Sequence, residues 1–300
     1  MMSQDTMERI VASVSCLLVG IIGVAANGIV TLFLLKLRDF RNAFGQLIVY
    51  HTTSNLILVL AYILWVPPCT MFGLSSWMEI NRTTGQLTII AQAMAYHSMF
   101  LLSLNRLVAA FFPLRYPTIF SVLIARVLIA VTFTWCLVYG CAYFWKDCYF
   151  VFNDIVFQWE FGDTSCGRFV ATYIDFYYSL GMFAVIYNMD ALAGIRLHMV
   201  LKATARSGVY SGKERLKRDV RFFLQTMSNT LVFSLTVLSF HVISTHMTTK
   251  MTQFVTTTLV WGINHAAAGV IIILFNPEFQ DFLFLRKTAN PSSAWAPSLH

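Results

Sequence analysis

Charged residues are scarce in this chain of 300 residues, and their scarcity excludes a soluble protein. Asp, Glu, Lys and Arg make up 12% of the sequence, against roughly 25% in an ordinary globular protein. Hydrophobic residues make up 57%, and the mean hydropathy is +0.66. Six cysteines are too few for a disulfide-based scaffold. The net charge of +7 would suggest nucleic-acid binding in a soluble chain; here we expect a lipid bilayer as partner and no nucleic acid.

The apolar residues gather in seven runs, each long enough to cross a bilayer as a helix of about 20 residues. Strands of a barrel would instead alternate over about 10 residues. The first run has 24 residues, more than the roughly 7–15 of a signal peptide, and no basic stretch precedes it. We predict an all-α integral membrane protein, a seven-transmembrane helix bundle at 12–275, with an N-terminus at 1–11 and a tail at 276–300. The runs are 12–35, 47–66, 87–111, 123–144, 169–193, 222–243 and 254–275.

Lys and Arg are shared unequally between the two sides of the predicted bundle, with sixteen on one side and five on the other. Because basic residues are retained in the cytoplasm, we predict that the C-terminus is cytoplasmic and the N-terminus is outside. The sixteen are Lys36, Arg38, Arg41, Arg106, Arg115, Arg126, Arg196, Lys202, Arg206, Lys213, Arg215, Lys217, Arg218, Arg221, Arg286 and Lys287. The five are Arg9, Arg82, Lys146, Arg168 and Lys250.

Two features of the predicted outer loops agree with this orientation. A usable Asn-Arg-Thr glycosylation sequon begins at Asn81 and is expected in an outer loop. Cys148 and Cys166 bracket another outer loop, where an oxidising environment allows a disulfide. We hypothesise that these two cysteines pair; the alternative is two free thiols with Cys69 as a competing partner.

Polar side chains inside the spans are expensive and therefore informative. Asn27 lies in the middle of the first span among small residues, which favours a hydrogen bond between closely packed helices. The alternative is an amide that bonds only to a local carbonyl. Asn55 in the second span, Asn264 in the seventh and Asn276 at its end invite the same interpretation.

Two carboxylates lie within the fifth predicted span. Asp175, about two turns from the outer end, is a candidate anion for a cationic or hydrogen-bonding ligand. Alternatively, its side chain snorkels to the membrane surface or pairs with Arg168, seven residues earlier on about the same face. Asp190 lies near the inner end, and we expect it to pair with Arg196. His97 in the third span is a second candidate ligand-binding residue.

Signatures of enzymes and cofactor sites are absent from the sequence. It has no His-Glu-x-x-His, no Gly-x-Ser-x-Gly within a span and no phosphate-binding glycine loop. His241 and His246 are five residues apart, which does not match the i, i+4 spacing of a helical metal pair. The seventh span has no lysine, which excludes a retinal Schiff base. We expect no catalytic residue, no metal and no cofactor.

Six motifs occur in order along almost the whole chain. They are GVAANG at 23–28, LRDFRNAFGQL at 37–47, WVPP at 65–68, SLNRLVAAFFPLRYPTIFS at 103–121, CYFVF…WEF…C at 148–166 and LFNPEF at 274–279. The block at 103–121 is the most specific. Through this set, residues 18–282 resemble the nematode serpentine chemoreceptors, most closely serpentine receptor class x, a branch related to rhodopsin-like G-protein-coupled receptors.

The resemblance implies a receptor in the plasma membrane of sensory neurons. It would detect an external chemical, a small molecule or a peptide, and signal to a heterotrimeric G protein. We expect the G protein to contact five residues of the cytoplasmic side. They are Arg106, Arg115, Tyr116, Lys217 and Arg218. The alternative is that these cations only set topology and contact anionic lipid.

The chain departs from better-studied receptors at several positions. Asn105 stands where those receptors have an acidic residue before the cytoplasmic Arg, and Gln280 stands where their last motif has Tyr. The sixth span has neither Trp nor Pro, and the third span has no Cys at its outer end. These departures keep open a receptor-fold protein without signalling. A small-solute transporter or channel subunit is a further alternative, although no inverted repeat is present.

Overall fold

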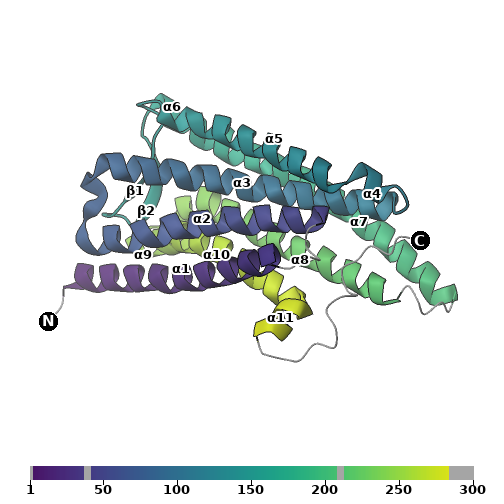
Figure 1. Ribbon diagram of the computed structural model, residues 1–300. Helices are drawn as coiled ribbons and strands as arrows, with labels where there is room; N and C mark the ends of the chain where they lie inside the picture. The colour runs from purple at the N-terminus through teal and green to yellow at the C-terminus, as the bar shows by residue number, and fades with distance from the viewer. Residues whose placement is uncertain (1–2, 37–41, 208–212, 284–300) are drawn as a thin grey trace.

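The computed structural model of the chain describes residues 3–36, 42–207 and 213–283. Seven of the described helices are long and apolar enough to cross a membrane (Figure 1). The predicted all-α seven-helix membrane bundle is confirmed, and several helices extend beyond the predicted runs. The expected loop bases Arg38 and Arg41, and the tail beyond residue 283, lie outside the described residues. The spans are Gln4–Lys36, Ala43–Phe72, Met78–Phe111, Val122–Phe144, Ser165–Ala203, Val220–His246 and Lys250–Phe275.

Several spans are interrupted by short segments of other geometry, so the structure has more elements than spans. In chain order they are α1 (Gln4–Lys36), α2 (Ala43–Phe72), η2 (Leu74–Ser76), α3 (Met78–Phe111), α4 (Tyr116–Ile119), α5 (Val122–Cys141), η3 (Ala142–Phe144), β1 (Phe150–Asn153), β2 (Gln158–Phe161), α6 (Ser165–Phe169), η4 (Val170–Tyr177), α7 (Tyr178–Ser207), α8 (Lys213–Leu238), η6 (Ser239–Ile243), η7 (Ser244–His246), α9 (Lys250–Phe254), η8 (Val255–Leu259), α10 (Val260–Phe275) and α11 (Pro277–Leu283).

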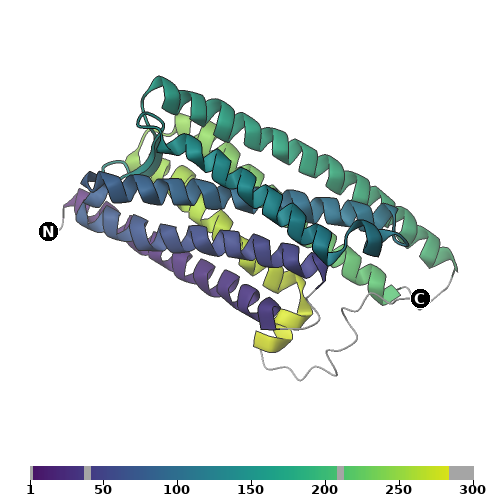
Figure 2. The ribbon, with the colours of Figure 1, turned by 45° about the horizontal axis from the view of Figure 1, so that its top comes forward.

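The two ends of the bundle carry different elements. The start of α1, the strands β1 and β2, and α9 lie at one end, which we call the hairpin end (Figures 1 and 2). The short helix α4, the end of α7 and the helix α11 lie toward the other, which we call the Arg106 end. In its most apolar window α3 is 78% buried and α5 only 11%, so α3 is the central helix and α5 lies on the periphery.

Local sequence explains where several helices begin and end. The side chain of Asn42 accepts a hydrogen bond from the N–H of Gly45 at 2.8 Å and begins α2. Ser121 does the same for the N–H of Ile124 at 3.3 Å and begins α5. Gly73 ends α2 with a left-handed φ of 70°, a conformation that costs glycine little.

The loop between the fourth and fifth spans contains a β-hairpin that the all-α prediction did not include. The strands pair in antiparallel fashion, with Phe150 opposite Phe161 and Phe152 opposite Trp159. Aromatic and β-branched residues favour strands, and aromatic cross-strand pairs stabilise them. The alternation of Phe150, Val151 and Phe152 was therefore a usable signal.

Three spans contain π-helical turns, all in their halves nearest the hairpin end. These turns are η4 in the fifth span, η6 in the sixth and η8 in the seventh. A π-helical turn inserts extra backbone into a helix, changes the direction of side chains and often marks a functional site. The sixth span thus has an irregularity at η6 although it contains neither Trp nor Pro.

Buried side chains form two hydrophobic clusters. The cluster at the hairpin end is rich in aromatic rings, including Trp65, Phe152, Trp159 and Trp261. The other cluster extends toward the Arg106 end and is mainly aliphatic, with Leu, Ile, Val and Ala alongside a few rings. Aromatic pairs add about 0.5–1.5 kcal/mol each beyond the apolar area they bury, so the hairpin end gains more from specific ring contacts.

Candidate functional site

A small cavity with a volume of about 20 Å³ lies near the hairpin end of the bundle. It has room for about one water molecule, so a larger ligand requires the lining side chains to move. Its wall is aromatic and aliphatic with a few polar groups, and it comes from α3, β1, η4, α8, η6 and α10. The lining side chains are Ile89, Gln92, Phe150, Asp175, Phe233, Thr236, Val237, Phe240, His241 and Trp261.

Asp175 lies in this wall and is held by donors from two other helices. Gln92 Nε2 donates to Asp175 Oδ1 at 3.2 Å, and His241 Nε2 lies 2.9 Å from Asp175 Oδ2. Trp261 Nε1 donates to Gln92 Oε1 at 2.5 Å. These side chains form one hydrogen-bonded chain that joins α3, η4, η6 and α10 around the cavity.

The expected alternative partner of Asp175 is wrong. Arg168 binds Asp163 instead, with Nη1 at 2.6 Å from Oδ1, and both side chains are exposed. The reason is that η4 is π-helical, so seven-residue spacing no longer places the two residues on one face.

His97, the other predicted ligand-binding residue, does not line the cavity. Its Nδ1 lies 2.7 Å from the carbonyl oxygen of Ala93, and its Nε2 lies 2.9 Å from the hydroxyl oxygen of Tyr178. Both ring nitrogens therefore have partners within the protein, and the structure separates His97 from Asp175.

The β-hairpin covers the cavity from the hairpin end. The Phe150 ring lines the cavity and stacks on Trp159 with centroids 5.2 Å apart. The α3 backbone approaches β1 so closely at Gly85 that a Cβ there would lie 1.8 Å from the carbonyl oxygen of Phe150. Only glycine allows this approach, so the hairpin packs directly onto α3.

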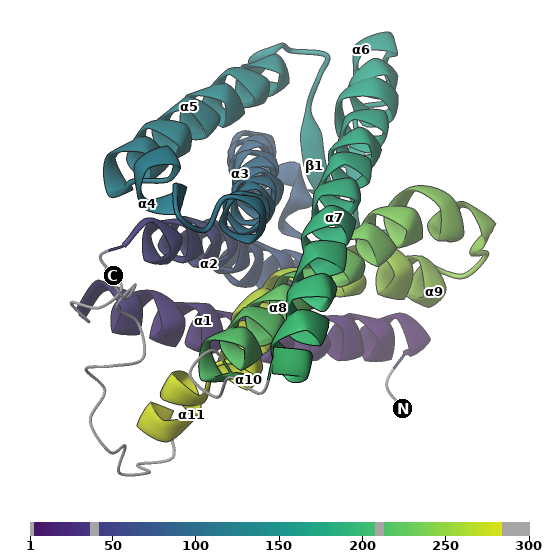
Figure 3. The same ribbon diagram turned by 90° about the vertical axis from the view of Figure 1, so that its right-hand side faces the viewer.

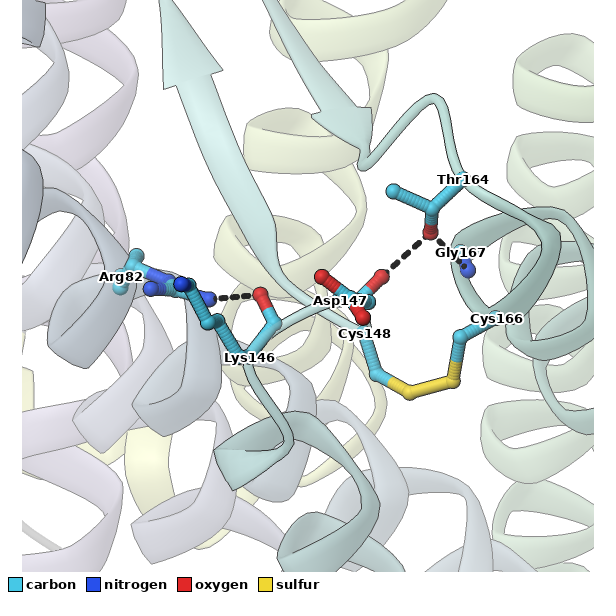
Figure 4. The surroundings of a disulfide bond; sticks show 7 residues. All are labelled: Arg82, Lys146, Asp147, Cys148, Thr164, Cys166 and Gly167. Carbon is cyan, nitrogen blue, oxygen red and sulfur yellow. Dashed lines mark hydrogen bonds between the residues drawn. A yellow bond between two sulfur atoms is a disulfide. The ribbon is translucent and has the colours of Figure 1, made fainter.

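A disulfide between Cys148 and Cys166 connects the hairpin to the start of the fifth span (Figure 4). The competing partner Cys69 is a free, buried cysteine. Arg82 of α3 donates to the carbonyl oxygen of Lys146 beside this disulfide. The loop is therefore attached both covalently and by hydrogen bonds.

Asn81 does not support the predicted glycan attachment, because its amide is used inside the protein. It lies in α3 rather than in a loop and is 1% exposed. Its Oδ1 accepts from the N–H of Phe152 at 2.9 Å and from Trp65 Nε1 at 2.9 Å. Its Nδ2 donates to the carbonyl oxygen of Phe152 at 2.8 Å. Asn81 thus pairs with the backbone of β1 as a neighbouring strand would.

Arg106 forms a buried ion pair at the opposite end of the bundle. Its Nη2 lies 2.9 Å from Asp190 Oδ1, and the two side chains are 10% and 0% exposed. Ser103 donates to the same carboxylate oxygen, and Arg106 Nη1 donates to the carbonyl oxygen of Phe222 at 3.1 Å. The expected Asp190–Arg196 pair is wrong: Asp190 is buried against α3, so its partner comes from that helix and not from its own.

Asn105, next to Arg106, binds the short helix α4. Its Nδ2 donates to the hydroxyl oxygen of Tyr116 at 2.8 Å, and the Tyr116 ring stacks on Phe120 with centroids 6.2 Å apart. Burial raises the pKa of the Tyr116 hydroxyl, and the bond from Asn105 partly opposes this rise. The hydroxyl therefore stays protonated at neutral pH.

The other predicted coupling residues lie in the segment between α3 and α5 and at the start of α8. Arg115 is exposed and immediately precedes α4. Lys217 is exposed on α8, which begins at Lys213, so the basic segment extends the sixth helix. The side chain of Arg218 lies outside the described residues.

The polar residues expected to join helices occupy a buried layer between the two ends. Asn27 Nδ2 donates to the carbonyl oxygen of His265 at 3.0 Å and links α1 to α10. Asn55 Oδ1 lies 2.7 Å from His265 Nδ1 and links α2 to α10. Asn276 Nδ2 donates to Gln225 Oε1 at 2.8 Å and links α10 to α8. Asn264 Nδ2 is buried and has no hydrogen-bond partner among the described residues.

Sequence reasoning missed the roles of Gln92, His241 and Trp261. His241 entered it only as half of an unsuitable metal pair. A usable signal existed, because an intramembrane polar or ionisable side chain marks a functional site by default. What the sequence did not show was that three separate spans bring these residues to Asp175.

The fold is that of rhodopsin. The crystal structure of squid rhodopsin matches with a TM-score of 0.74 and 14% sequence identity, covering 95% of this chain and 87% of that chain. The class that the fold defines is therefore a seven-helix membrane bundle of the rhodopsin type.

The sequence places the chain more narrowly. Residues 17–276 match the family described as serpentine-type seven-transmembrane G-protein-coupled chemoreceptor Srx, and the chain belongs to this family of receptors. It is similar to serpentine receptor class X 45 of Caenorhabditis elegans, with 22% identity over 87% of this chain and 77% of that protein. It is also similar to serpentine receptor class X-43 of the same organism, with 25% identity over 94% and 88%.

Proposed function

We propose that this chain is a plasma-membrane chemoreceptor of sensory neurons, which binds an external chemical near Asp175 and signals to a heterotrimeric G protein through the Arg106 end. Membership in a chemoreceptor family supports the class of function. The excess of Lys and Arg among segments of the Arg106 end supports a cytoplasmic position for that end and an outer position for the hairpin.

One observation carries the signalling part of the proposal. Arg106 is held by Asp190 on a different helix, the fifth span, although its neighbour in the sequence is the uncharged Asn105. The departure at Asn105 therefore does not leave Arg106 without a carboxylate. An ion pair between α3 and α7 restrains these helices, and a G protein that binds Arg106 would compete with Asp190.

Asp190→Asn tests this proposal because it removes the charge of the carboxylate and keeps its size. In membranes that contain the full chain and purified heterotrimeric G proteins, we expect ligand-independent GTPγS binding to rise several-fold. Arg106→Ala in the same background should return exchange to the level of membranes without the receptor.

Asp163→Asn is the matched control. It makes the same chemical change in an ion pair with Arg168 whose side chains are exposed, and exposed pairs contribute little. We expect wild-type exchange. If Asp190→Asn is folded and inserted yet exchanges no faster than wild type with any tested G protein, the chain is better described as a receptor-fold protein without signalling.

A further inference from the structure

The cavity near Asp175 has its exposed edge on one helix. Eight of its ten lining side chains are buried, and the two that are partly exposed are Phe240 and His241, both on η6. Phe150, which the hairpin contributes, is only 3% exposed. The cavity therefore opens sideways at η6 and is closed toward the hairpin.

The hairpin is held at its turn as well as at its base. Phe157 in the turn is fully buried, and its carbonyl oxygen accepts a hydrogen bond from Thr258 at 2.9 Å. Lys250 Nζ lies 3.8 Å from the centre of the Phe157 ring, a cation–π contact. Together with Asn81 and the disulfide, these contacts hold the hairpin closed over the cavity.

The fifth and sixth spans separate where the cavity opens. Figure 3 shows that α7 and α8 lie together at the Arg106 end, whereas at the hairpin end α6, which begins the fifth span, lies apart from α9, the short helix that follows the sixth span. Across this divergence, His241 bonds Asp175 at 2.9 Å, and its ring lies 4.9 Å from that of Phe176. The side chain of His241 thus closes the gap between η4 and η6.

The residues beside this gap are apolar and face the membrane. Tyr177 on η4, Leu238 at the end of α8 and Val242 on η6 are all exposed large hydrophobic residues, and all lie within membrane-spanning helices. Side chains of this kind on the outside of a spanning helix contact lipid tails. The gap therefore leads from the cavity to the bilayer and not to water.

The polar groups inside the cavity favour an uncharged ligand. Both carboxylate oxygens of Asp175 are already bonded, one by Gln92 and the other by His241. A ligand ammonium would have to displace these donors, whereas a hydroxyl or carbonyl group can join the chain of hydrogen bonds. The remaining wall is mostly aromatic and aliphatic and suits an apolar body.

From these observations we infer that the ligand is an uncharged amphiphile that dissolves in the bilayer and reaches the cavity between η4 and η6, with Phe176 and His241 as the gate. This inference rests on the proposed function, because it names the ligand class and the route of that same site. Partitioning into the membrane would concentrate such a ligand beside the gap.

Photolabelling of the full chain in bilayer nanodiscs tests the route. The probe is a medium-chain aliphatic alcohol that carries a diazirine; a second diazirine probe, on a disulfonated carrier, stays in water. After short irradiation at increasing times, peptides are identified by mass spectrometry. We expect the alcohol to label peptides that contain Phe240 or Trp261, and the sulfonated probe to leave them unlabelled.

Three variants separate the gap from the hairpin. Phe176→Ala removes the ring that packs on His241 and should speed labelling several-fold; Phe176→Leu should give an intermediate rate. Phe169→Ala changes an exposed phenylalanine of the same span and should label at the wild-type rate. Lys250→Ala loosens the hairpin turn and should also leave the rate unchanged. Equal final labelling of all variants shows that the cavity is intact.

The inference is overturned if the sulfonated probe labels the lining peptides, or if Lys250→Ala speeds labelling and the Phe176 variants do not. It is also overturned if the alcohol never labels them. Nucleotide exchange by Asp190→Asn, measured on the same preparation, distinguishes these failures. Raised exchange without labelling rejects the ligand class and keeps the receptor function. Labelling without raised exchange keeps the ligand class and route and rejects signalling to a G protein.

Discussion

The hairpin end and the Arg106 end of this bundle are held together by different kinds of contact. The hairpin end has a disulfide, backbone pairing through Asn81 and stacked aromatic rings. At the Arg106 end, the central contact is the ion pair between Arg106 and Asp190. Removing one of many independent contacts lowers stability, whereas removing an ion pair that a binding partner can replace changes the conformational equilibrium.

The hydrogen bonds of the two ends support this difference. Each polar atom of the Asn81 amide is bonded to the protein. By contrast, Arg106 Nε and Asp190 Oδ2 are buried and have no hydrogen-bond partner among the described residues. A buried group without a partner costs about 1–3 kcal/mol, so the ion pair is less favourable than a fully bonded one. Substitutions at the hairpin end should therefore change stability, and those at the Arg106 end should change signalling.

Loss of the disulfide should have the largest effect on stability. Cys148→Ser with Cys166→Ser removes a crosslink between residues 18 apart, worth about 3 kcal/mol in the chain-entropy model. We expect a clear fall in melting temperature. A thiol-reactive dye measures it, because the dye reacts with the buried cysteines when unfolding exposes them. Cys141→Ser, at an exposed free cysteine, should melt like wild type. An equal fall in both proteins would contradict the special role of this loop.

Asn81→Ala should have the second largest effect. It leaves the N–H and carbonyl of Phe152 without their partner, which costs about 2 kcal/mol or somewhat more, and thermal melting measures the loss. Thr83→Ala also destroys the sequon but touches only the carbonyl oxygen of Glu79, so it should melt like wild type. A gel provides the opposing outcome. If both variants migrate like glycosidase-treated wild type, and faster than untreated wild type, Asn81 carries a glycan after all.

A carboxylate at position 105 should affect signalling more than stability. Asn105→Asp places a negative charge beside Arg106, and the Tyr116 hydroxyl can still bond to it. In the Asp190→Asn background, we expect basal GTPγS binding to fall several-fold toward the wild-type level. Because position 105 is buried, the desolvation of the new carboxylate offsets its attraction to Arg106, and the net change in stability is small. Asn188→Asp, at an exposed position of α7, is the control and should not lower exchange. Restoration by both substitutions would indicate a general charge effect.

The sequence predicts the fold because the bilayer imposes a simple rule. Every backbone group must be bonded within the membrane, so long apolar runs become helices, and the seven runs were visible without any structure. The Cys148–Cys166 pair was also predictable, since two cysteines bracketing one loop lie close together. The hairpin was missed because its strands have only four residues each and contact α3 through Asn81, far away in sequence.

The candidate site was less predictable because it depends on contacts between distant spans. The sequence favours Arg196, on the same helix, as the partner of Asp190, but its partner in the structure, Arg106, lies 84 residues away. The sequence marks Asp175 as an unusual intramembrane carboxylate, whereas its bond to His241 depends on the π-helical turns η4 and η6. Spacing rules for a regular helix fail at such turns, and a single sequence contains no signal that marks them here.

Gln280, which replaces the Tyr of better-studied receptors, should give the smallest effect. Its Nε2 donates to the carbonyl oxygen of Leu274 at 2.7 Å and lies 3.3 Å from that of Ile273. These carbonyls belong to the last turn of α10, where no backbone N–H follows in the helix to bond them. Gln280→Ala should therefore cost about 0.5–1 kcal/mol, as measured by thermal melting.

Gln253→Ala removes a similar bond, to the carbonyl oxygen of Met247, at the hairpin end. If Gln280→Ala also raises basal exchange and Gln253→Ala does not, Gln280 belongs with Arg106 among the contacts that restrain signalling; equal melting shifts with unchanged exchange make it a helix cap alone.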